Sequence, residues 1–297
     1  MKDILTIIFR LTVTCLVAGI IMGGCFILTN KAKQHNEHVN EQRVMLNLLG
    51  YSKSNPAPES MELHEVYRYV VTEGETLSVA YLLPVYESFA FVNIGLDGSF
   101  LSQHSVDISE EKVIKADERD SAIMAALGPG RSIRFADQTI VVTNGGKRQA
   151  YLLPGEFTGF KTFIKVILAV DPDLTVLGLD VMEHEEDPGL GGEIVQDYFK
   201  GQFKGKDFET IKKLKVAKLP LPDEYQQALE SDKNGLNEEE VARIKGLYSD
   251  KDIYALTGAT ISSRSVTNGV KGIVKKFAYR MSILDRVLDK QQIAVPF

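Results

Sequence analysis

The chain has 297 residues, of which 44% are hydrophobic and 25% charged, and its formal net charge is −6. This length and composition predict a folded protein of about two domains with a sizeable core. An acidic chain without a Lys/Arg-rich tract is not typical of proteins that bind nucleic acid. The patterns of a P-loop, a dinucleotide-binding fold, a zincin and a c-type haem protein do not occur, and no metal site is predicted.

The first feature along the chain is an apolar segment, residues 11–29, without a charged residue. At about 1.5 Å per residue a helix of this length spans roughly 28 Å, near the thickness of a bilayer core. We therefore predict one transmembrane helix after a short N-terminal segment, residues 1–10. Gly19 and Gly23 offer a small-residue face for packing on another membrane helix. The charges on the two flanks are too similar to orient the helix.

Two alternatives for this segment stay open. Met22-Gly23-Gly24-Cys25 is a poor lipobox, which makes a lipoprotein anchored through Cys25 a weaker alternative. A cleaved secretory signal peptide also begins with a charged residue and continues as an apolar run. Cys15 and Cys25 lie in the same predicted helix, so a disulfide between them is implausible, and the absence of other cysteines suits an oxidising compartment.

Beyond the apolar segment the sequence predicts an α+β fold. A polar stalk and a Pro/Ser-rich linker occupy residues 30–60. A first α+β module, residues 61–150, contains a predicted helix at 109–127 and strands at 65–71, 77–83, 89–95 and 133–143. A second module, residues 151–285, contains strands at 163–170 and 176–182, a helix at 193–203 and a polar surface excursion at 219–250. A C-terminal tail, residues 286–297, completes the chain.

A long amphipathic helix is predicted after Ser263. Its apolar side chains recur with the helical period at Val266, Val270, Ile273, Val274, Phe277, Met281 and Leu284. We expect Thr260 just before the first turn and Ser262 or Ser263 as the N-cap. The free N–H groups and the dipole of a helix start favour an anion there, and Arg264 could donate to phosphate oxygens. These residues alone leave an ordinary turn with an N-cap as the alternative to an anion site.

Two motifs resemble a known family. Thr257-Gly258-Ala259-Thr260-Ile261-Ser262-Ser263 resembles the (Ser/Thr)-Gly-Ala-Thr motif of the FMN-binding domain family. The stretch from His184 to Gly191, read as His-Glu-Glu-Asp-Pro-Gly-Leu-Gly, resembles the His-x-Glu-Thr-Pro-Gly-Leu-Gly stretch of Rnf G subunits, and a similar stretch occurs in the C subunits of sodium-translocating NADH:quinone reductases. The resemblance covers the N-terminal anchor and roughly residues 150 to 280. Two departures are Tyr254, where the family has Asp and the nearest acid here is Asp252, and Asp187, where the family has Thr.

The resemblance implies FMN bound covalently to Thr260 through a phosphoester that a separate flavin transferase installs. The surrounding phosphate site would use the side chains or backbone of Thr257, Gly258, Ala259, Ser262, Ser263 and Arg264. The flavin ring would lie against a loop with Glu186, Pro188, Gly189, Leu190 and Gly191. Residues 184–187 are four possible metal ligands, but adjacent residues at a strand end point in alternate directions and cannot all reach one ion. The alternative to a role beside the flavin is therefore a solvated turn.

The resemblance further implies a single-pass subunit of the inner membrane, with the short N-terminus, residues 1–10, in the cytoplasm and the α+β domain on the periplasmic side. Such a subunit is an electron carrier of an Rnf-type ion-translocating complex of the ferredoxin:NAD oxidoreductase type. It has no catalytic residues and no turnover of its own, and its partners are the other membrane and redox subunits. Two alternatives are the C subunit of the quinone reductase and a non-redox extracytoplasmic binding or scaffold module.

Overall fold

The computed structural model describes residues 2–86, 88–230 and 235–297, which form two units, residues 1–47 and 48–297. Helix α1 (Lys2–Leu48) begins the chain. Within the described residues, its segment Thr6–Ile27 is the one stretch of helix long and apolar enough to cross a membrane. The polar residues predicted as a stalk continue α1 as a helix to Leu48.

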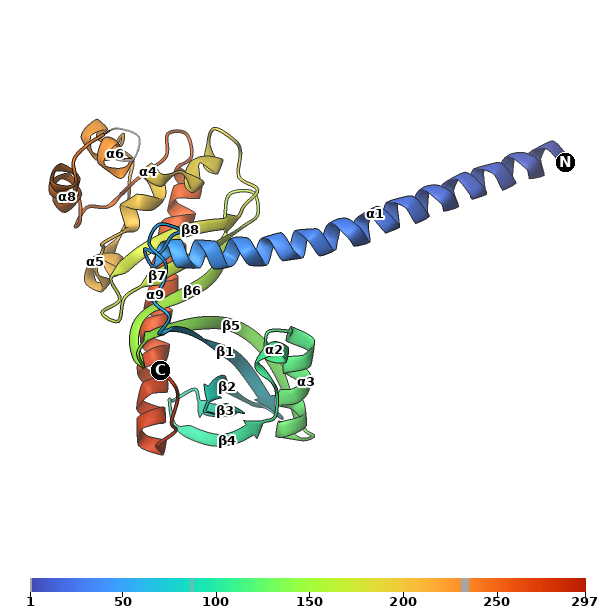
Figure 1. The fold of residues 1–297 in the computed structure, drawn as a ribbon, viewed down its shortest axis with the longest axis horizontal. Helices are drawn as coiled ribbons and strands as arrows, with labels where there is room; N and C mark the ends of the chain where they lie inside the picture. Colours follow the sequence, from blue (N-terminus) through green and yellow to red (C-terminus); the bar gives the residue numbers. More distant parts are fainter. Residues whose placement is uncertain (1, 87, 231–234) are drawn as a thin grey trace. The chain divides into compact units, whose positions relative to one another are not determined.

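The second unit is built on one eight-stranded sheet in the order β4-β3-β2-β1-β5-β6-β7-β8 (Figure 1). Every neighbouring pair of strands is antiparallel. The strands are β1 (Met61–Glu73), β2 (Thr76–Val85), β3 (Ser88–Gly95), β4 (Phe100–Val106), β5 (Arg131–Asn144), β6 (Lys147–Thr158), β7 (Phe163–Val170) and β8 (Val176–Glu183). The α+β fold class predicted from the sequence is confirmed.

Two strands of this eight-stranded sheet, β4 and β6, were not predicted from the sequence. β4 is polar along much of its length, and its residues alternate between exposed and half-buried, as expected of a strand at the edge of a sheet. β6 contains Pro154, which has no N–H to donate and argues against a strand when only the sequence is known. The predicted boundary between residues 150 and 151 falls inside β6, so the two predicted modules share this sheet.

Helices cover both faces of the β1–β4 part of the sheet. α2 (Glu110–Val113) and α3 (Ala116–Leu127) pack on one face, against a cluster that includes Tyr69 and Phe91. The long helix α9 (Thr260–Gln291) packs on the other face, where Val92 and Leu83 are buried with its apolar side chains. The single helix predicted at 109–127 is divided at Lys115, whose backbone is extended.

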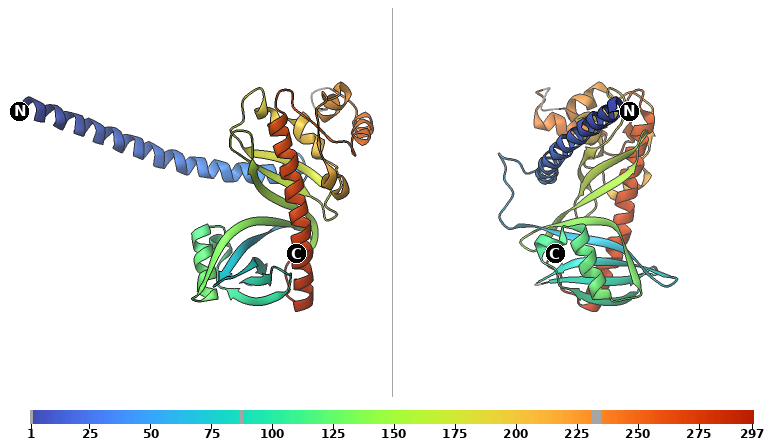
Figure 2. Two further views of the ribbon diagram at one scale, coloured as in Figure 1. Left: turned by 180° about the vertical axis from the view of Figure 1, so that it is seen from behind. Right: turned by 90° about the vertical axis from the view of Figure 1, so that its right-hand side faces the viewer.

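The sheet opens between β5 and β6, and this opening is the main irregularity of the fold. β5 pairs with β1 along its whole length, but it pairs with β6 only through residues 140–144. The other end of β6, residues 153–158, pairs with β7 alone. α9 runs across both parts of the sheet and spans the opening (Figures 1 and 2).

Short elements connect β8 to α9. They are η1 (Gly191–Val195), α4 (Asp197–Lys200), η2 (Gly201–Phe203), α5 (Phe208–Lys213), β9 (Val216–Ala217), α6 (Asp223–Leu229), α8 (Glu238–Leu247) and β10 (Ile253–Tyr254), with β9 and β10 parallel. The helix predicted at 193–203 is interrupted at Gln196, whose backbone is extended. The predicted excursion contains α6 and α8, which pack together, while its residues 231–234 lie outside the described part of the chain.

Candidate functional site

The Thr-Gly-Ala-Thr motif forms a tight turn directly before α9. The N–H of Ala259 donates to the carbonyl of Leu256 at 3.0 Å, which places Thr257 and Gly258 at the tip of the turn, both exposed. Gly258 has a φ of +76°, a backbone conformation that residues other than glycine rarely adopt. The sequence Thr-Gly at this point is therefore what the turn requires.

α9 begins one turn earlier than predicted, at Thr260, and its N-cap is Ala259, which has no side chain able to cap. The predicted capping by Ser262 or Ser263 is wrong, because both hydroxyls are buried and bonded elsewhere. The Ser263 hydroxyl donates to the Ala259 carbonyl and accepts from the Leu256 N–H, each at 3.0 Å. In the described part of the chain, no acceptor bonds the N–H groups of Thr260, Ile261 and Ser262.

Glu186 is a buried carboxylate at the centre of this region, with 5% of its surface exposed. One of its oxygens accepts the N–H groups of Phe160 at 2.7 Å and Lys161 at 3.3 Å. The other accepts the hydroxyl of Ser262. The solvated-turn interpretation is therefore wrong for Glu186, which joins the β6–β7 turn, the loop after β8 and the first turn of α9.

Two glycines allow the backbone to approach this carboxylate. A Cβ atom on Gly159 would lie 2.3 Å from Glu186 Oε1. A Cβ atom on Gly191 would lie 2.6 Å from both Glu186 Oε2 and Ser262 Oγ. Both distances are shorter than a carbon atom tolerates, so any larger residue at either position would displace the carboxylate or the helix start. Gly191 thus has a packing role that follows from its contact with Glu186.

The two sequence motifs meet at Leu190. A Cβ atom on Gly258 would lie 2.9 Å from Leu190 Cδ2, so the leucine packs directly on the turn. Pro188 and Gly189 are exposed beside it. The Leu190 side chain is 47% exposed, and Ile261, next to Thr260, is 54% exposed. Apolar side chains from both motifs are therefore available to a ligand held at Thr260.

The remaining polar residues of the second motif point in different directions. His184 Nδ1 accepts the N–H of Glu186 at 3.2 Å, and Glu185 is exposed. Asp187 forms an ion pair with Lys161, which raises the pKa of the Lys161 ammonium. Asp187 thus helps to join the β8 loop to the β6–β7 turn.

Tyr254, which stands where the related motifs have Asp, anchors the strand before the motif. Its backbone N–H donates to Gln202 Oε1 at 2.7 Å, and its carbonyl accepts from Gln202 Nε2 at 3.3 Å. Its ring makes edge-on contacts with Tyr225 and Tyr248, which are themselves stacked with centroids 4.2 Å apart. The nearby acid, Asp252, accepts the N–H of Lys215 and therefore fixes β9 beside β10.

Lys206 is a buried residue that sequence reasoning missed. Its ammonium donates to three backbone carbonyls, those of Tyr248 at 3.2 Å, Ser249 at 3.0 Å and Lys251 at 2.7 Å. Burial lowers the pKa of Lys206 to about 8. The only sequence signal is a Gly-Lys-Asp stretch that resembles many exposed loops. Lys206 orders the segment that leads into β10 and the motif.

The start of α9 fits an anionic group such as a phosphate. The free N–H groups of its first turn and its helix dipole favour negative charge, and no side chain among the described residues caps them. Arg264, one turn further on and exposed, has no bonded partner among the residues that the structure describes. Ser262 and Ser263 direct their hydroxyls inward, so among the predicted contacts they fit a structural role better than direct contact with phosphate.

Comparisons with known proteins agree with the motifs. Residues 159–275 match the family model of the FMN-binding domain. The chain is 33% identical, over 44% of its length, to the G subunit of the proton-translocating ferredoxin:NAD(+) oxidoreductase complex of Clostridium ljungdahlii, and this match spans only 55% of that relative. It is 24% identical to the C subunit of the Na(+)-translocating NADH-quinone reductase of Yersinia pestis, over 86% of the chain and 83% of that relative.

Among solved structures, NqrC of Shewanella oneidensis aligns with 72% of the chain and 77% of its own, at 19% identity and a TM-score of 0.37. The family match begins at Gly159, beside Glu186, and continues through the motif at Thr260 into α9. It therefore contains both motifs and the buried carboxylate that joins them. Residues 159–275 of this chain are therefore similar to the FMN-binding domain family.

Proposed function

We propose that the chain is a membrane-anchored electron carrier of an Rnf-type ion-translocating complex, with FMN attached covalently to Thr260. The observation that carries the proposal is the site at the start of α9. There Thr260, a half-buried residue, stands at an uncapped helix N-terminus beside an open glycine turn. The FMN-binding domain match over the same residues supplies the identity of the anion.

Different residues around Thr260 would bind the phosphate and the ring of the cofactor. The first-turn N–H groups and Arg264 would stabilise the phosphate charge. Gly258 would let the ligand approach the backbone, while Leu190 and Ile261 would contact an apolar ring. Glu186 would act indirectly, because it holds the two motifs together. When bound, FMN would supply the redox chemistry, and the protein would supply position and electrostatic environment.

The remaining parts of the proposal follow from α1 and from the relatives. The Thr6–Ile27 segment would anchor the chain as a single-pass protein in the inner membrane, with the FMN-binding domain on the periplasmic side. The relatives are named as subunits of complexes, so we propose other redox and membrane subunits as partners. A flavin transferase would install the phosphoester on Thr260, and the chain would have no turnover alone.

The experiment is flavin fluorescence of the denatured chain on a gel after expression with a flavin transferase. The native chain should fluoresce, Thr260→Val should not, and Thr257→Val should still fluoresce, because Thr257 is an exposed neighbour at the turn rather than the attachment residue. A dark native chain beside a fluorescent positive control would reject the carrier function. It would favour a non-redox binding or scaffold module, an outcome that Tyr254 in place of the usual acid makes worth testing.

A second candidate is the C subunit of a sodium-translocating NADH:quinone reductase. It is favoured by the extent of the similarity, since the Yersinia pestis protein aligns with 86% of the chain, against 44% for the Clostridium ljungdahlii protein. Both candidates predict the same flavin on Thr260. Identification of the proteins that copurify with the full chain separates them.

A further inference from the structure

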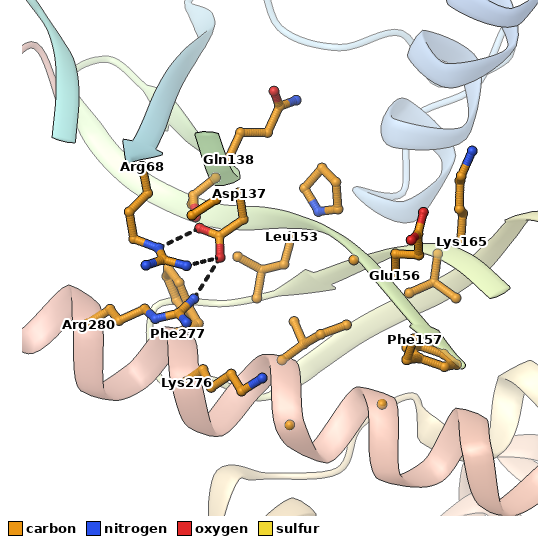
Figure 3. Close-up of a pocket in the computed structure, with 18 of the residues that line it drawn as sticks. Arg68, Asp137, Gln138, Leu153, Glu156, Phe157, Lys165, Lys276, Phe277 and Arg280 are labelled. Atoms are coloured by element: carbon orange, nitrogen blue, oxygen red, sulfur yellow. Dashed lines mark hydrogen bonds and ion pairs between the residues drawn. The ribbon is translucent and has the colours of Figure 1, made fainter. Parts of the chain in front are cut away.

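A groove of about 1050 Å³ lies where the sheet opens between β5 and β6, beneath α9 (Figure 3). Its floor comes from residues 135–139 of β5 and 153–158 of β6, the portions of these two strands that do not pair with each other. α9 forms its wall with a stripe of residues that includes Ser265, Gly272 and Arg280. A volume of this size is ample for a small-molecule ligand.

The groove is separate from the attachment site at Thr260. Thr260 does not line it, and the lining residue of α9 nearest to Thr260 is Ser265. At about 100° per residue, Thr260 lies roughly 140° around the helix from Ser265 and its stripe. Arg280, at the far end, is about 30 Å along the helix from Thr260. Binding of a ligand in the groove is therefore independent of flavin attachment at Thr260.

One end of the groove carries excess positive charge. Arg68 donates to Asp137 with Nε at 2.8 Å and Nη2 at 2.5 Å, and Arg280 Nη1 donates to the same carboxylate at 2.8 Å (Figure 3). Asp137 thus neutralises one of two guanidinium groups. Lys276, one turn before Arg280 on the same stripe of α9, has no hydrogen bond or ion pair with any residue that the structure describes. The chain as a whole is acidic, so this cationic cluster is a local feature.

The rest of the groove is lined mainly by apolar side chains, with the charged residues Glu156 and Lys165 at its opposite end, and it has room beside α9 (Figure 3). Leu153, Val166 and Phe277 line it, and Figure 3 shows Leu153 and Phe277 between β6 and α9. A Cβ atom on Gly272 would meet no atom within 4 Å, so the groove is open at this point of the helix. Apolar walls with a cationic end match a molecule that has an apolar body and an anionic head.

We propose that the groove binds a single-chain anionic amphiphile, a long-chain carboxylate. Its carboxylate would bind Lys276 and the donors of Arg280 that Asp137 leaves free. Its hydrocarbon chain would lie along Gly272 toward the β6 end of the groove, shielded by Leu153 and Phe277. Arg68 already binds the carboxylate of Asp137 in fork geometry, and Arg280 donates to it through Nη1 alone, so this end of the groove binds carboxylates.

The test uses a tryptophan reporter, because the chain contains no Trp. The full chain carrying Asn268→Trp, an exposed position that lines the groove, is placed in phosphatidylcholine nanodiscs and titrated with dibromostearate, whose bromines quench tryptophan on contact. Leu247→Trp, exposed on α8 and outside the groove, reports quenching by fatty acid that has only partitioned into the nanodisc. We expect saturable quenching of the Asn268→Trp chain alone.

Two second-site changes identify the binding chemistry. Lys276→Gln should weaken binding about tenfold, as expected for loss of a charge-assisted hydrogen bond, and the methyl ester of dibromostearate should bind as weakly. Gly272→Leu should block the groove, whereas Gly246→Leu, at a helical glycine of α8 that is equally open, should leave binding unchanged. Equal quenching of the two reporters would overturn the proposal. So would titrations that neither Lys276→Gln nor Gly272→Leu alters.

Discussion

At the scale of single residues, Glu186 explains how two distant motifs form one site. Its carboxylate bonds to backbone N–H groups 25 and 26 residues away and to a hydroxyl 76 residues away. Burial of an anion is costly unless donors surround it, and here three donors do so. The local sequence His-Glu-Glu-Asp carries no sign of these partners, which is why its burial could not be predicted.

Glu186→Ala should lower the free energy of unfolding of the full chain in detergent micelles by about 2 kcal/mol, because it removes the acceptor of the buried Ser262 hydroxyl and of two part-buried N–H groups. Glu186→Gln should lose less, since its amide keeps one acceptor oxygen and Ser262 can turn to accept. The matched control is Glu185→Ala, an exposed neighbour that should change stability by no more than about 0.5 kcal/mol. Urea unfolding measures all three, and an equal effect of the two alanine variants would contradict this role.

Lys206 gives stability a distinct pH dependence. Its pKa is lowered to about 8 by burial, from an ordinary value of 10.5, so between these values the unfolded chain binds a proton that the folded chain does not. The contribution of Lys206 to stability should therefore rise as the pH increases from about 8 to 10.5, by up to about 3 kcal/mol.

The measurement is the difference in unfolding free energy between the native chain and Lys206→Met at several pH values in this window. This difference should grow in favour of the native chain as the pH rises. Lys204→Met, at an exposed position, should show no such trend. A difference that stays constant from pH 7 to 10.5 would show that the Lys206 ammonium keeps an ordinary pKa.

At the scale of elements, α9 connects the candidate site at Thr260 to both parts of the sheet. The helical period of α9 could be predicted from its continuous apolar face. The strands β7 and β8 could be predicted from their apolar segments. The starting residue of α9 could not be predicted, since both serines of the motif bond to partners on other segments or the preceding turn. The opening between β5 and β6 could not be predicted either, because it depends on which residues of the two strands pair with each other.

Substitutions of two glycines of α9 test how closely the helix packs on β6. A Cβ atom on Gly269 would lie 2.2 Å from the Phe157 ring, whereas one on Gly272 would meet nothing within 4 Å. Gly272→Ala should stabilise the full chain by about 0.5–1 kcal/mol through helix propensity. Gly269→Ala should destabilise it by about 1–2 kcal/mol, since overpacking outweighs the same gain. Stabilisation by both substitutions in urea unfolding would show that Phe157 moves aside without cost.

At the scale of the whole molecule, the chain combines an apolar N-terminal helix with an α+β unit whose residues 159–275 match the FMN-binding domain family. In that unit the proposed attachment site at Thr260 and the groove lie along one helix, α9, at different positions on its surface. The family and the fold class were predictable because the Thr-Gly-Ala-Thr motif and the Pro-Gly-Leu-Gly stretch are short and local. The contacts among Glu186, Gly159 and Gly191 were not, because they join three segments.

The central claim is that Thr260, and no other hydroxyl of the motif, carries FMN. Trypsin should release residues 252–264 as one peptide, since it cleaves after Lys251 and Arg264, and this peptide contains Tyr254, Thr257, Thr260, Ser262 and Ser263. Fragmentation mass spectrometry of this peptide, from the full chain produced with a flavin transferase, should place the added FMN phosphoryl group on Thr260. Modification of another hydroxyl, or an unmodified peptide beside a flavinylated control protein, would contradict the account.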